Sequence, residues 1–292
     1  MAQKFEFIEW RAYWVGRVNR SDLEERFGVS TPQASLDLRA YVEAAPENIE
    51  YDKNEKAYLP KPGFQPKYLK LSADRYLRQL DAILNSAISA VDTWFGSPPP
   101  AAVMQMVLRN VEPEILRTVL RAIDGRLALD VVYQSINKGT QTRTIVPHGL
   151  GFDGHRWHAR AWCVSRQEYR DFVISRIISV NDSRPVDTNP SNDIEWIKLV
   201  DLKLVAHPKL NDAQRATIER DFGMVNGVRT ITTRAALAYY YIRNLNLDLS
   251  DDAIPPERKQ LHLTNLAEVE NCQRLAREES KKITSALNVR AL

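Results

Sequence analysis

The sequence lacks most of the features that mark secreted proteins and membrane proteins. It holds only two cysteines, Cys163 and Cys272, which lie far apart without a CxxC or CxxH partner. This scarcity argues against a disulfide framework or a structural zinc site and favours a reduced, cytoplasmic location. No run approaches the ~18 apolar residues that a membrane span needs, and the first residues contain no apolar segment typical of a secretory signal. We therefore expect no membrane partner.

Catalytic motifs are missing as well. The histidines form no HExxH pair, and neither GxSxG nor GxxxxGK[ST] occurs, although hydrolysis or phosphoryl transfer needs such a base, nucleophile, metal site or phosphate loop. We expect no enzyme, no catalytic residue, no metal and no cofactor. A literal GxGxxG at 149–154 lies between two strand-like segments, whereas a dinucleotide site needs a strand followed by a helix. Its Asp153-Gly154 pair predicts a hairpin turn instead.

What is present is the composition of an ordinary globular protein, with 44% apolar and 26% charged residues. A length of 292 residues allows two or three compact units. The segment 1–60 carries eight Lys and Arg against eleven Asp and Glu, a net charge of −3, so the remainder of the chain carries +6. Nucleic-acid binding by this segment would therefore depend on where the cations stand and not on bulk charge.

The segment 1–60 is typical of a winged helix-turn-helix. Apolar side chains recur close to helical spacing over residues 5–18. Residues 19–21 supply a cap for a short helix that ends near Gly28, and Ser30 or Thr31 with Pro32 begins the next helix. Residues 49–59 predict two strands around a turn at 52–55, which would form the wing.

This region resembles the N-terminal domain of DeoR-type regulators, in which V-S-x-x-T-x-x-x-D-L is typical. Val29, Ser30, Asp37 and Leu38 match, while Gln33 stands where Thr is usual. The resemblance implies double-stranded DNA as a partner, and a glutamine suits adenine through N6 and N7. The candidate DNA-binding residues are Arg20, Ser30, Thr31, Gln33, Ser35, Arg39, Lys53 and Lys56.

Residues 61–125 predict a helical connector. Residues 61–66 form a linker, and Ser72 caps a helix whose apolar stripe continues to Phe95. A second helix is expected over 113–123.

Residues 126–184 predict consecutive strands that combine aromatic and cationic side chains. Alternation places His158, Arg160 and Trp162 on one face of a strand at 156–163. Arginine binds phosphate or carboxylate in a bidentate manner and stacks on bases. In the absence of a catalytic set, this indicates a pocket for a small anionic or nucleotide-like ligand. The candidate ligand-binding residues are Tyr133, Ser135, Arg143, His158, Arg160 and Arg176.

The order of these residues resembles the WYL domain of bacterial transcription regulators. The naming triplet is changed, because His158 and Ala159 follow Trp157 where Tyr and Leu are usual. This change, with Arg160 close behind, is similar to WYL regulators found beside phage-defence islands of BREX and CBASS type. The resemblance covers nearly the whole chain. It implies a small Sm- or SH3-like β-barrel and a nucleotide or nucleic-acid-derived effector ligand.

The C-terminal third of the chain predicts strands at 200–206 and 228–233, helices at 212–222 and 235–247, and a final helix at 264–287. This βαβα order resembles the C-terminal extension of many WYL proteins, which is associated with dimerisation. The expected fold class is therefore α+β and multidomain. Its parts are a winged helix-turn-helix at 1–60, a helical connector at 61–125, a WYL-like ligand-sensing β-barrel at 126–184 and a βαβα dimerisation domain at 195–292.

Two functions fit this organisation. The first is a ligand-responsive, sequence-specific repressor of a phage-defence operon, which binds an inverted-repeat operator as a homodimer, because a two-fold dimer presents two recognition helices to matching half-sites. The alternative is a nucleic-acid-binding WYL accessory protein that modulates an effector enzyme, since Arg and Trp on one strand face also suit stacking on unpaired bases. An accessory protein has no need of a winged helix, which favours the first.

Overall fold

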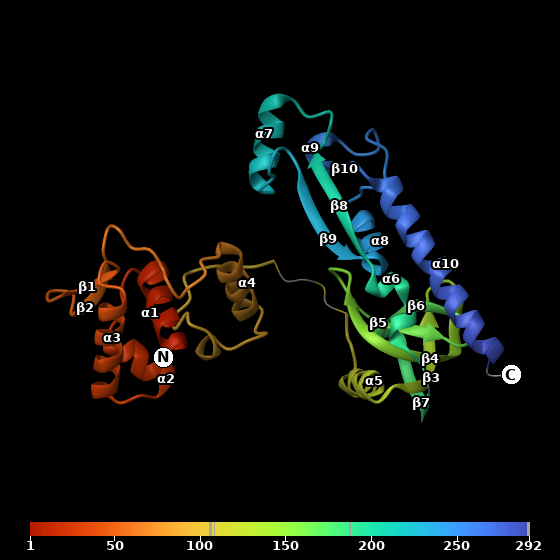
Figure 1. Cartoon of the computed structure of the whole chain (residues 1–292), viewed down its shortest axis with the longest axis horizontal. Coiled ribbons are helices and arrows are strands. Elements are labelled where there is room, and N and C mark those ends of the chain that lie inside the picture. Colours follow the sequence, from red (N-terminus) through yellow and green to blue (C-terminus); the bar gives the residue numbers. More distant parts are fainter. Residues whose placement is uncertain (105–106, 108, 187, 291–292) are drawn as a thin grey trace. The chain divides into compact units, whose positions relative to one another are not determined.

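The computed structural model describes residues 1–104, 107, 109–186 and 188–290, the last six of these through the backbone alone. The chain divides into two compact units, residues 1–106 and 107–292 (Figure 1). Both units combine helices with antiparallel strands, which confirms the α+β fold class. Within the described part of the chain, no helix is long and apolar enough to cross a membrane.

The first unit begins with the predicted winged helix-turn-helix. Its elements are α1 (Ala2–Val15), α2 (Arg20–Phe27), α3 (Thr31–Ala44) and the two antiparallel strands of the wing, β1 (Ile49–Asp52) and β2 (Ala57–Pro60). Helix α2 starts where Asn19 and Asp22 form a reciprocal capping box, and it ends at Gly28 with φ 62°. Glycine adopts this left-handed conformation without strain, so it stops the helix cleanly.

A carboxyl group lies inside the core of this unit. Glu9 of α1 is fully buried. It accepts hydrogen bonds from the backbone N–H groups of Lys67, Tyr68 and Leu69 at 2.6–2.8 Å, and from the Tyr41 hydroxyl at 3.0 Å. Because a buried polar group costs free energy unless its hydrogen bonds are made, Glu9 fastens the segment after the wing to α1.

Helix α4 (Ala73–Leu84) is shorter than the sequence predicts, because we expected it to continue to Phe95. Ser86 adopts φ 56°, and a residue in the left-handed region cannot continue a right-handed helix. The chain then turns through the short η1 (Ala90–Asp92), which brings the Phe95 ring to 5.3 Å from that of Trp10. The apolar residues that resembled a helical stripe therefore belong to a returning loop.

The second unit contains a five-stranded antiparallel sheet with α5 (Pro113–Gly125) packed on one face. Its strands are β3 (Leu127–Ser135), β4 (Gly139–Phe152), β5 (Trp157–Cys163), β6 (Glu168–Val173) and β7 (Ile177–Pro185), in the order β6-β5-β4-β3-β7. The short η2 (Ile174–Arg176) joins β6 to β7, so the last strand returns to pair with the first. Residues 149–154 run from β4 into the hairpin that leads to β5, which confirms the turn and excludes a dinucleotide loop.

The rest of this unit is a three-stranded antiparallel sheet with helices. Its elements are η3 (Pro190–Asn192), α6 (Ile194–Ile197), β8 (Leu199–Ala206), α7 (Asp212–Asp221), β9 (Arg229–Arg234), α8 (Ala235–Asn244), α9 (Pro256–Lys259), β10 (Leu261–Leu263) and α10 (Leu266–Arg290). The strand order is β10-β8-β9. The βαβα order and the final helix are as predicted. Strand β10 was missed, because so short a strand shows no alternating pattern.

Residues 61–125, which we expected to form one helical connector, are divided between the two units. Helix α4 contributes Leu80 to a cluster with Trp10 of α1. Helix α5 instead contributes Val119 and Ala122 to the core of the five-stranded sheet. Each helix is thus an integral part of its own unit.

Candidate nucleic-acid and ligand sites

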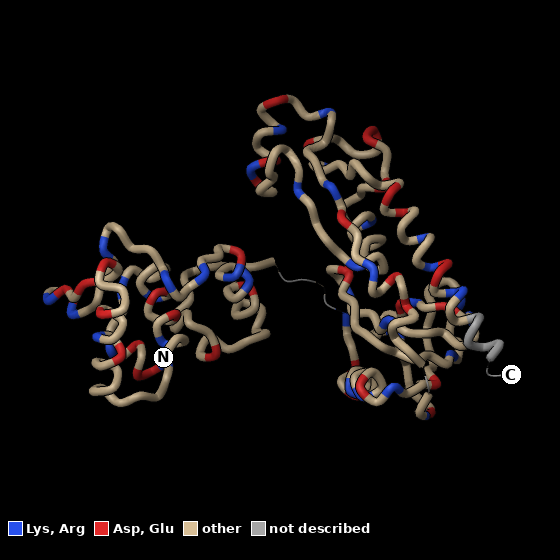
Figure 2. Tube along the Cα trace, in the orientation of Figure 1, with Lys and Arg blue, Asp and Glu red and all other residues tan. Residues whose placement is uncertain are grey.

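A groove of about 520 Å³ lies between α3, the amino-terminal end of α2 and the wing. Each element contributes one cation, namely Arg39, Arg20 and Lys56, and the only lining carboxylate among the described residues is Glu24. Figure 2 marks basic and acidic residues together at the tip of the wing, where Lys53 and Lys56 stand beside Glu55. A cationic groove beside an exposed helix suits the phosphate backbone of a duplex, even though residues 1–60 are acidic as a whole.

Five of the eight predicted DNA-binding residues line this groove: Arg20, Thr31, Ser35, Arg39 and Lys56. Ser30 stands at the N-cap of α3 with no capping hydrogen bond from its side chain. Lys53 is exposed in the turn of the wing. Gln33 is exposed but lies outside the groove, and its Nε2 donates to Asp37 Oδ1 at 3.0 Å. That bond occupies one of the amide hydrogens with which Gln33 would read a base.

The sequence reasoning missed two groove residues on the wing, Tyr51 and Tyr58. Their ring centroids lie 5.2 Å apart, and Tyr51 is 51% exposed. An exposed tyrosine in a short strand is ordinary in sequence, so only its place beside Lys56 and Arg39 indicates a role. Its hydroxyl can donate to a phosphate oxygen.

A second cavity, of about 360 Å³, opens on the five-stranded sheet. We call it the cationic cavity. Four predicted ligand-binding residues line it: Tyr133, Ser135, Arg143 and Arg176. It also holds three cations that were not predicted, Lys138, Arg166 and Arg170, and a single carboxylate, Asp171. This imbalance makes the cavity attractive to an anion.

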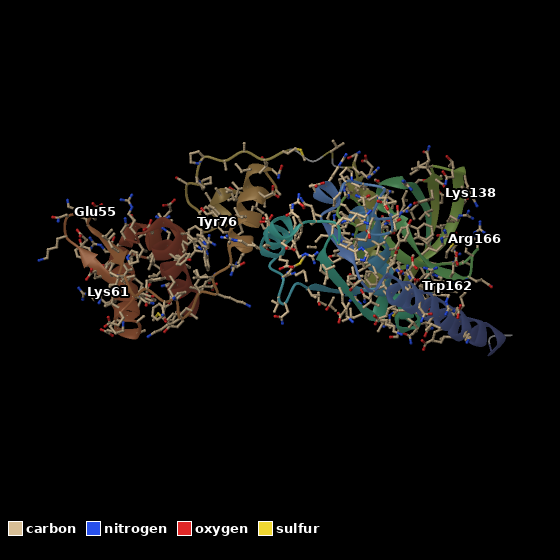
Figure 3. All side chains as sticks on the ribbon, turned by 90° about the horizontal axis from the view of Figure 1, so that it is seen from above. Glu55, Lys61, Tyr76, Lys138, Trp162 and Arg166 are labelled. Atoms are coloured by element: carbon tan, nitrogen blue, oxygen red, sulfur yellow. The ribbon has the colours of Figure 1, made fainter. Side chains whose placement is uncertain are left out.

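Three of the cations in the cationic cavity are not neutralised. Within the described part of the chain, the side chains of Lys138, Arg166 and Arg176 take part in no ion pair and no hydrogen bond. Figure 3 shows Lys138 and Arg166 projecting at one end of the second unit. They belong to the β3–β4 and β5–β6 turns, which lie at the same end of the sheet. The sequence reasoning considered strand faces and therefore overlooked these turns.

Two other predicted ligand residues are partly held by the protein. The Tyr133 hydroxyl accepts a hydrogen bond from Val173 N at 3.2 Å. The Arg143 guanidinium donates to Ser165 Oγ at 3.3 Å and contacts Gln141. Both still line the cavity, so their exposed faces remain available to a ligand.

His158 and Arg160 require a correction. They share a strand face as predicted, but the C-terminal elements cover that face and both side chains are buried. His158 Nε2 lies 2.9 Å from Asp153 Oδ2. Arg160 donates twice to Asp193, at 2.7 and 2.9 Å. Its guanidinium is therefore not free for an anionic ligand, as we had expected, but is bound by carboxylates of the protein. Alternation in one strand cannot reveal that a distant segment supplies carboxylates to the same face.

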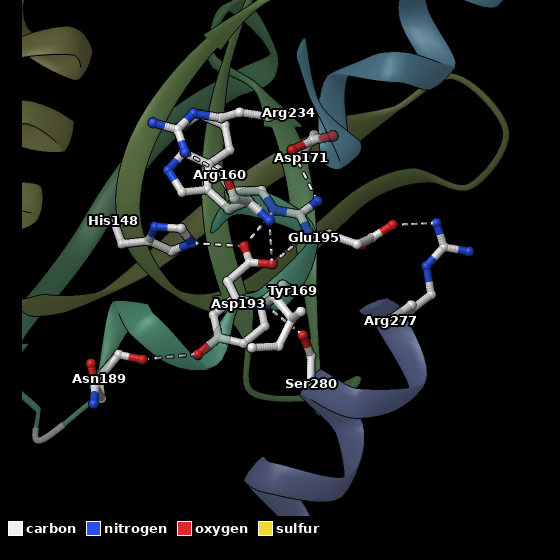
Figure 4. A network of polar contacts seen from close by, with 12 residues as sticks. His148, Arg160, Tyr169, Asp171, Asn189, Asp193, Glu195, Arg234, Arg277 and Ser280 are labelled. Atoms are coloured by element: carbon white, nitrogen blue, oxygen red, sulfur yellow. Dashed lines mark hydrogen bonds and ion pairs between the residues drawn. The ribbon is translucent and has the colours of Figure 1, made fainter. Parts of the chain in front are cut away.

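The Arg160 guanidinium lies at the centre of a polar network that joins the five-stranded sheet to the helical elements of the C-terminal part (Figure 4). It contacts Glu195 Oε2 at 2.9 Å and Asp171 Oδ1 at 3.3 Å. Glu195 also accepts from Arg277 of α10 at 2.8 Å, and Asp171 accepts from the Tyr240 hydroxyl of α8 at 2.9 Å. The ion pairs and the Tyr240 hydrogen bond together connect β5 and β6 to three helices of the C-terminal part.

Hydrogen bonds and ion pairs in this network favour the charged forms of Asp193 and Arg160. Burial disfavours the carboxylate of Asp193, but hydrogen bonds from Arg160 and His148 outweigh burial and lower its pKa. Burial likewise opposes the charge of Arg160, and the carboxylates around it still raise its pKa. Burial and the neighbouring Asp171 raise the pKa of Tyr240, which keeps its phenol protonated as a donor. Asp193 and Arg160 are thus held as a charged pair, and Tyr240 as a neutral donor.

A third cavity, of about 330 Å³, lies where β6 meets α8 and α10. Arg170 and Asp171 line both this cavity and the cationic cavity, so the two cavities are neighbours at β6. The described residues contain no group of three or more side chains able to hold a metal ion.

Comparison with known families finds matches to three segments of the chain. Residues 1–82 match the BrxR transcriptional regulator winged helix-turn-helix domain, residues 114–181 match the WYL domain, and residues 199–269 match the BrxR transcriptional regulator C-terminal dimerization domain. These matches confirm the resemblance proposed from the sequence.

Curated relatives are similar over nearly their full length. The chain is 39% identical over 269 residues to the DNA-binding transcriptional repressor CapW of Escherichia coli (strain KTE188), covering 91% of this chain and 90% of the relative. It is 38% identical over 280 residues to CapW of Stenotrophomonas maltophilia, with 94% and 93% covered. CapW of Pseudomonas aeruginosa is 34% identical over 271 residues, with 92% and 90% covered. All three relatives are named DNA-binding transcriptional repressors, and the chain belongs to the CapW family of such repressors.

Proposed function

We propose that the protein is a ligand-responsive repressor of a phage-defence operon, which binds an inverted-repeat operator as a homodimer and senses an anionic, nucleotide-like ligand. The winged helix supplies the groove for duplex DNA, and the C-terminal part supplies the contact between two copies. Half-sites are then expected about 10 base pairs apart or a multiple of that, because two related recognition helices must enter the same side of the duplex.

The observation that carries the ligand response is the position of Asp171. This carboxylate lines the cationic cavity, where it is the only negative group among the described lining residues. Its two oxygens also hold Arg160 and Tyr240. An anion bound in the cavity neutralises the cations around Asp171 and so changes the electrostatic potential at its carboxylate. This change strengthens or weakens the bonds from Asp171 to Arg160 and Tyr240.

This connection gives the ligand a route into the C-terminal part, which supplies the contact between two copies. Arg160 links Asp171 to Glu195, and Glu195 in turn bonds Arg277 on α10. A differential interaction of ~1–3 kcal/mol between two dimer geometries is enough to change operator affinity by about 5- to 150-fold. The route consists of direct contacts, so each member can be removed and its effect on ligand response measured.

The test begins with fluorescence anisotropy of a labelled duplex from immediately upstream of the protein's own gene, at roughly 150 mM salt because affinity depends on salt. A scrambled duplex and a single-stranded oligonucleotide serve as competitors. Nanomolar binding confined to an inverted repeat supports the repressor. Preference for the single strand contradicts it and favours an accessory protein that modulates an effector enzyme.

The ligand is tested on the same complex. Mononucleotides, short single-stranded oligonucleotides and inorganic polyphosphate are titrated into the protein–operator complex, with Arg176→Ala and the unchanged protein run in parallel. A change in operator affinity that the unchanged protein shows and Arg176→Ala loses supports the cationic cavity as the sensor. An equal response in both proteins places the ligand elsewhere.

A further inference from the structure

The strand β9 ends the three-stranded sheet, and its outer edge is paired with no other strand in the described part of the chain. Natural proteins protect such edges with charges, prolines, bulges or a covering element, because unpaired N–H and C=O groups invite another strand. Between Arg229 and Arg234, β9 carries only uncharged, β-branched residues, Thr230 to Thr233. Its register with β8 is continuous, without a bulge. This edge has the character of a pairing surface.

Exposed apolar side chains stand at both ends of this edge. At the amino-terminal end, Val225 and Val228 are 73% and 37% exposed, and they bracket a tight turn in which Asn226 and Gly227 both have positive φ. At the other end, Leu199 pairs with Arg234 and is 59% exposed, with Ile197 next to it at 47%. Two separate apolar patches thus lie at opposite ends of one strand.

An antiparallel pair of β9 strands related by a two-fold axis brings these ends together. The amino-terminal end of one strand then lies beside the carboxyl-terminal end of the other, so the patch at Val225 and Val228 approaches the partner's Leu199 and the partner's Ile197. Because Leu199 belongs to β8, one strand separates the two patches in this arrangement, and the axis repeats the contact. In this arrangement Arg234 keeps its contact within its own subunit, where its guanidinium lies 4.7 Å from the centre of the Trp196 ring.

We propose that β9 pairs with β9 of a second copy, which joins two three-stranded sheets into one of six strands. The family match over residues 199–269 names a dimerization domain, and β9 with both apolar patches except Ile197 falls inside it. The proposal rests on the homodimer of the proposed function and adds the surface by which it forms.

Single cysteines test the register of the strands. In a background of Cys272→Ala, with the buried Cys163 left in place, Thr230→Cys, Ile231→Cys and Thr232→Cys are oxidised separately and the covalent dimer is measured. Lys203→Cys is the matched control, because Lys203 stands directly opposite Thr230 but one strand farther from the edge. Pairing about a two-fold axis predicts at least a tenfold excess of cross-linked dimer at one β9 position over Lys203→Cys.

A second variant tests the apolar patches without relying on a cross-link. Val225→Glu is accommodated by each subunit because the side chain is largely exposed, so its melting temperature as a dilute monomer should be unchanged. Its dimer dissociation constant, measured by sedimentation, should rise at least tenfold. A dimer that persists with no β9 cross-link and no effect of Val225→Glu overturns the proposal, as does a protein that is monomeric at all concentrations. Operator binding is measured separately, so loss of DNA recognition is not confused with loss of this contact.

Discussion

Gly149 of β4 and Trp196 of α6 approach so closely that a Cβ atom on the glycine would lie 2.8 Å from the indole Cζ2. Real Cβ atoms do not reach such a distance without a shift of the neighbour. The contact therefore requires glycine for space, and it joins the five-stranded sheet to the segment that carries Asp193 and Glu195. The glycine that resembled part of a dinucleotide motif serves the packing of two substructures.

Gly149→Ala should lower the stability of the second unit. The added methyl group forces the indole away or bends β4, and overpacking of this kind costs about 1–3 kcal/mol. Urea denaturation followed by tryptophan fluorescence measures the change. Gly63→Ala is the control, because a Cβ there meets nothing within 4 Å. Equal stability of the two variants would show that Trp196 adapts freely.

Secondary-structure elements were predicted well where a local rule sets their ends. Features that depend on contacts with residues distant in the sequence were predicted less well. Capping residues and alternating strands placed α2, α3 and β5 correctly, because caps and periodicity act over short distances along the chain. The end of α4 was missed, since nothing in its apolar pattern shows the left-handed Ser86. Arg160 was wrongly expected to bind the ligand. Its main carboxylate partner, Asp193, belongs to a later part of the chain, and the pattern around Arg160 does not show that the two residues meet. Site residues in turns, such as Lys138, can be predicted only once the order of the strands in the sheet is known.

Arg160→Met should destabilise the second unit by about 3–5 kcal/mol, because it leaves the buried Asp193 without its guanidinium partner and Glu195 with only the partly exposed Arg277. Arg277→Met is a matched control, since Arg277 bonds the same Glu195 from a side chain that is 55% exposed, and exposed pairs contribute about 0.2–1 kcal/mol. Chemical denaturation of both variants provides the comparison. A loss no larger than that of the control would mean that Arg160 is not a structural cation.

Lys138→Ala and Arg166→Ala should weaken binding of an anionic ligand and leave the fold intact, because neither side chain makes an ion pair in the described structure. Each loss should reduce the dependence of ligand affinity on salt, since fewer counterions are exchanged. Arg121→Ala, an exposed change on α5 outside the cavity, is the control. Calorimetric titration with inorganic polyphosphate at two salt concentrations measures the effect. Unaltered affinity in both variants would exclude the cationic cavity as the binding site.

Arg39→Ala and Lys56→Ala should each reduce the slope of log affinity against log salt for operator DNA by about 0.9, the value for one phosphate contact. Lys70→Ala, in the same unit but outside the groove, should leave the slope unchanged. Anisotropy titrations between 50 and 200 mM salt, chosen to span roughly a fourfold range, give the slopes. Weaker binding at an unchanged slope would assign these residues to base contacts or to folding.

The stability of the second unit should fall as the pH drops below the ordinary histidine value of 6.5. Burial lowers the pKa of His207 despite the opposing charge of Asp251, so the unfolded chain binds a proton before the folded chain does. The free energy of unfolding then decreases by at most about 1.4 kcal/mol per pH unit. Denaturation at pH 7.5, 6.5 and 5.5, chosen at roughly one-unit steps around that value, should show a steeper fall than in His207→Gln. The exposed His155→Gln is the control, and identical profiles in all three proteins would contradict the assignment.

The buried Glu9 sets the shortest fragment in which the DNA-binding half can be studied alone. A fragment cut directly after the wing, at Pro60, keeps Tyr41 but removes the three backbone donors at Lys67, Tyr68 and Leu69. It would fold with an unsatisfied acceptor inside its core, and footprinting with it would report a damaged domain. Dissection of this regulator, by limited proteolysis or by gene truncation, should therefore be planned around the boundary near residue 106.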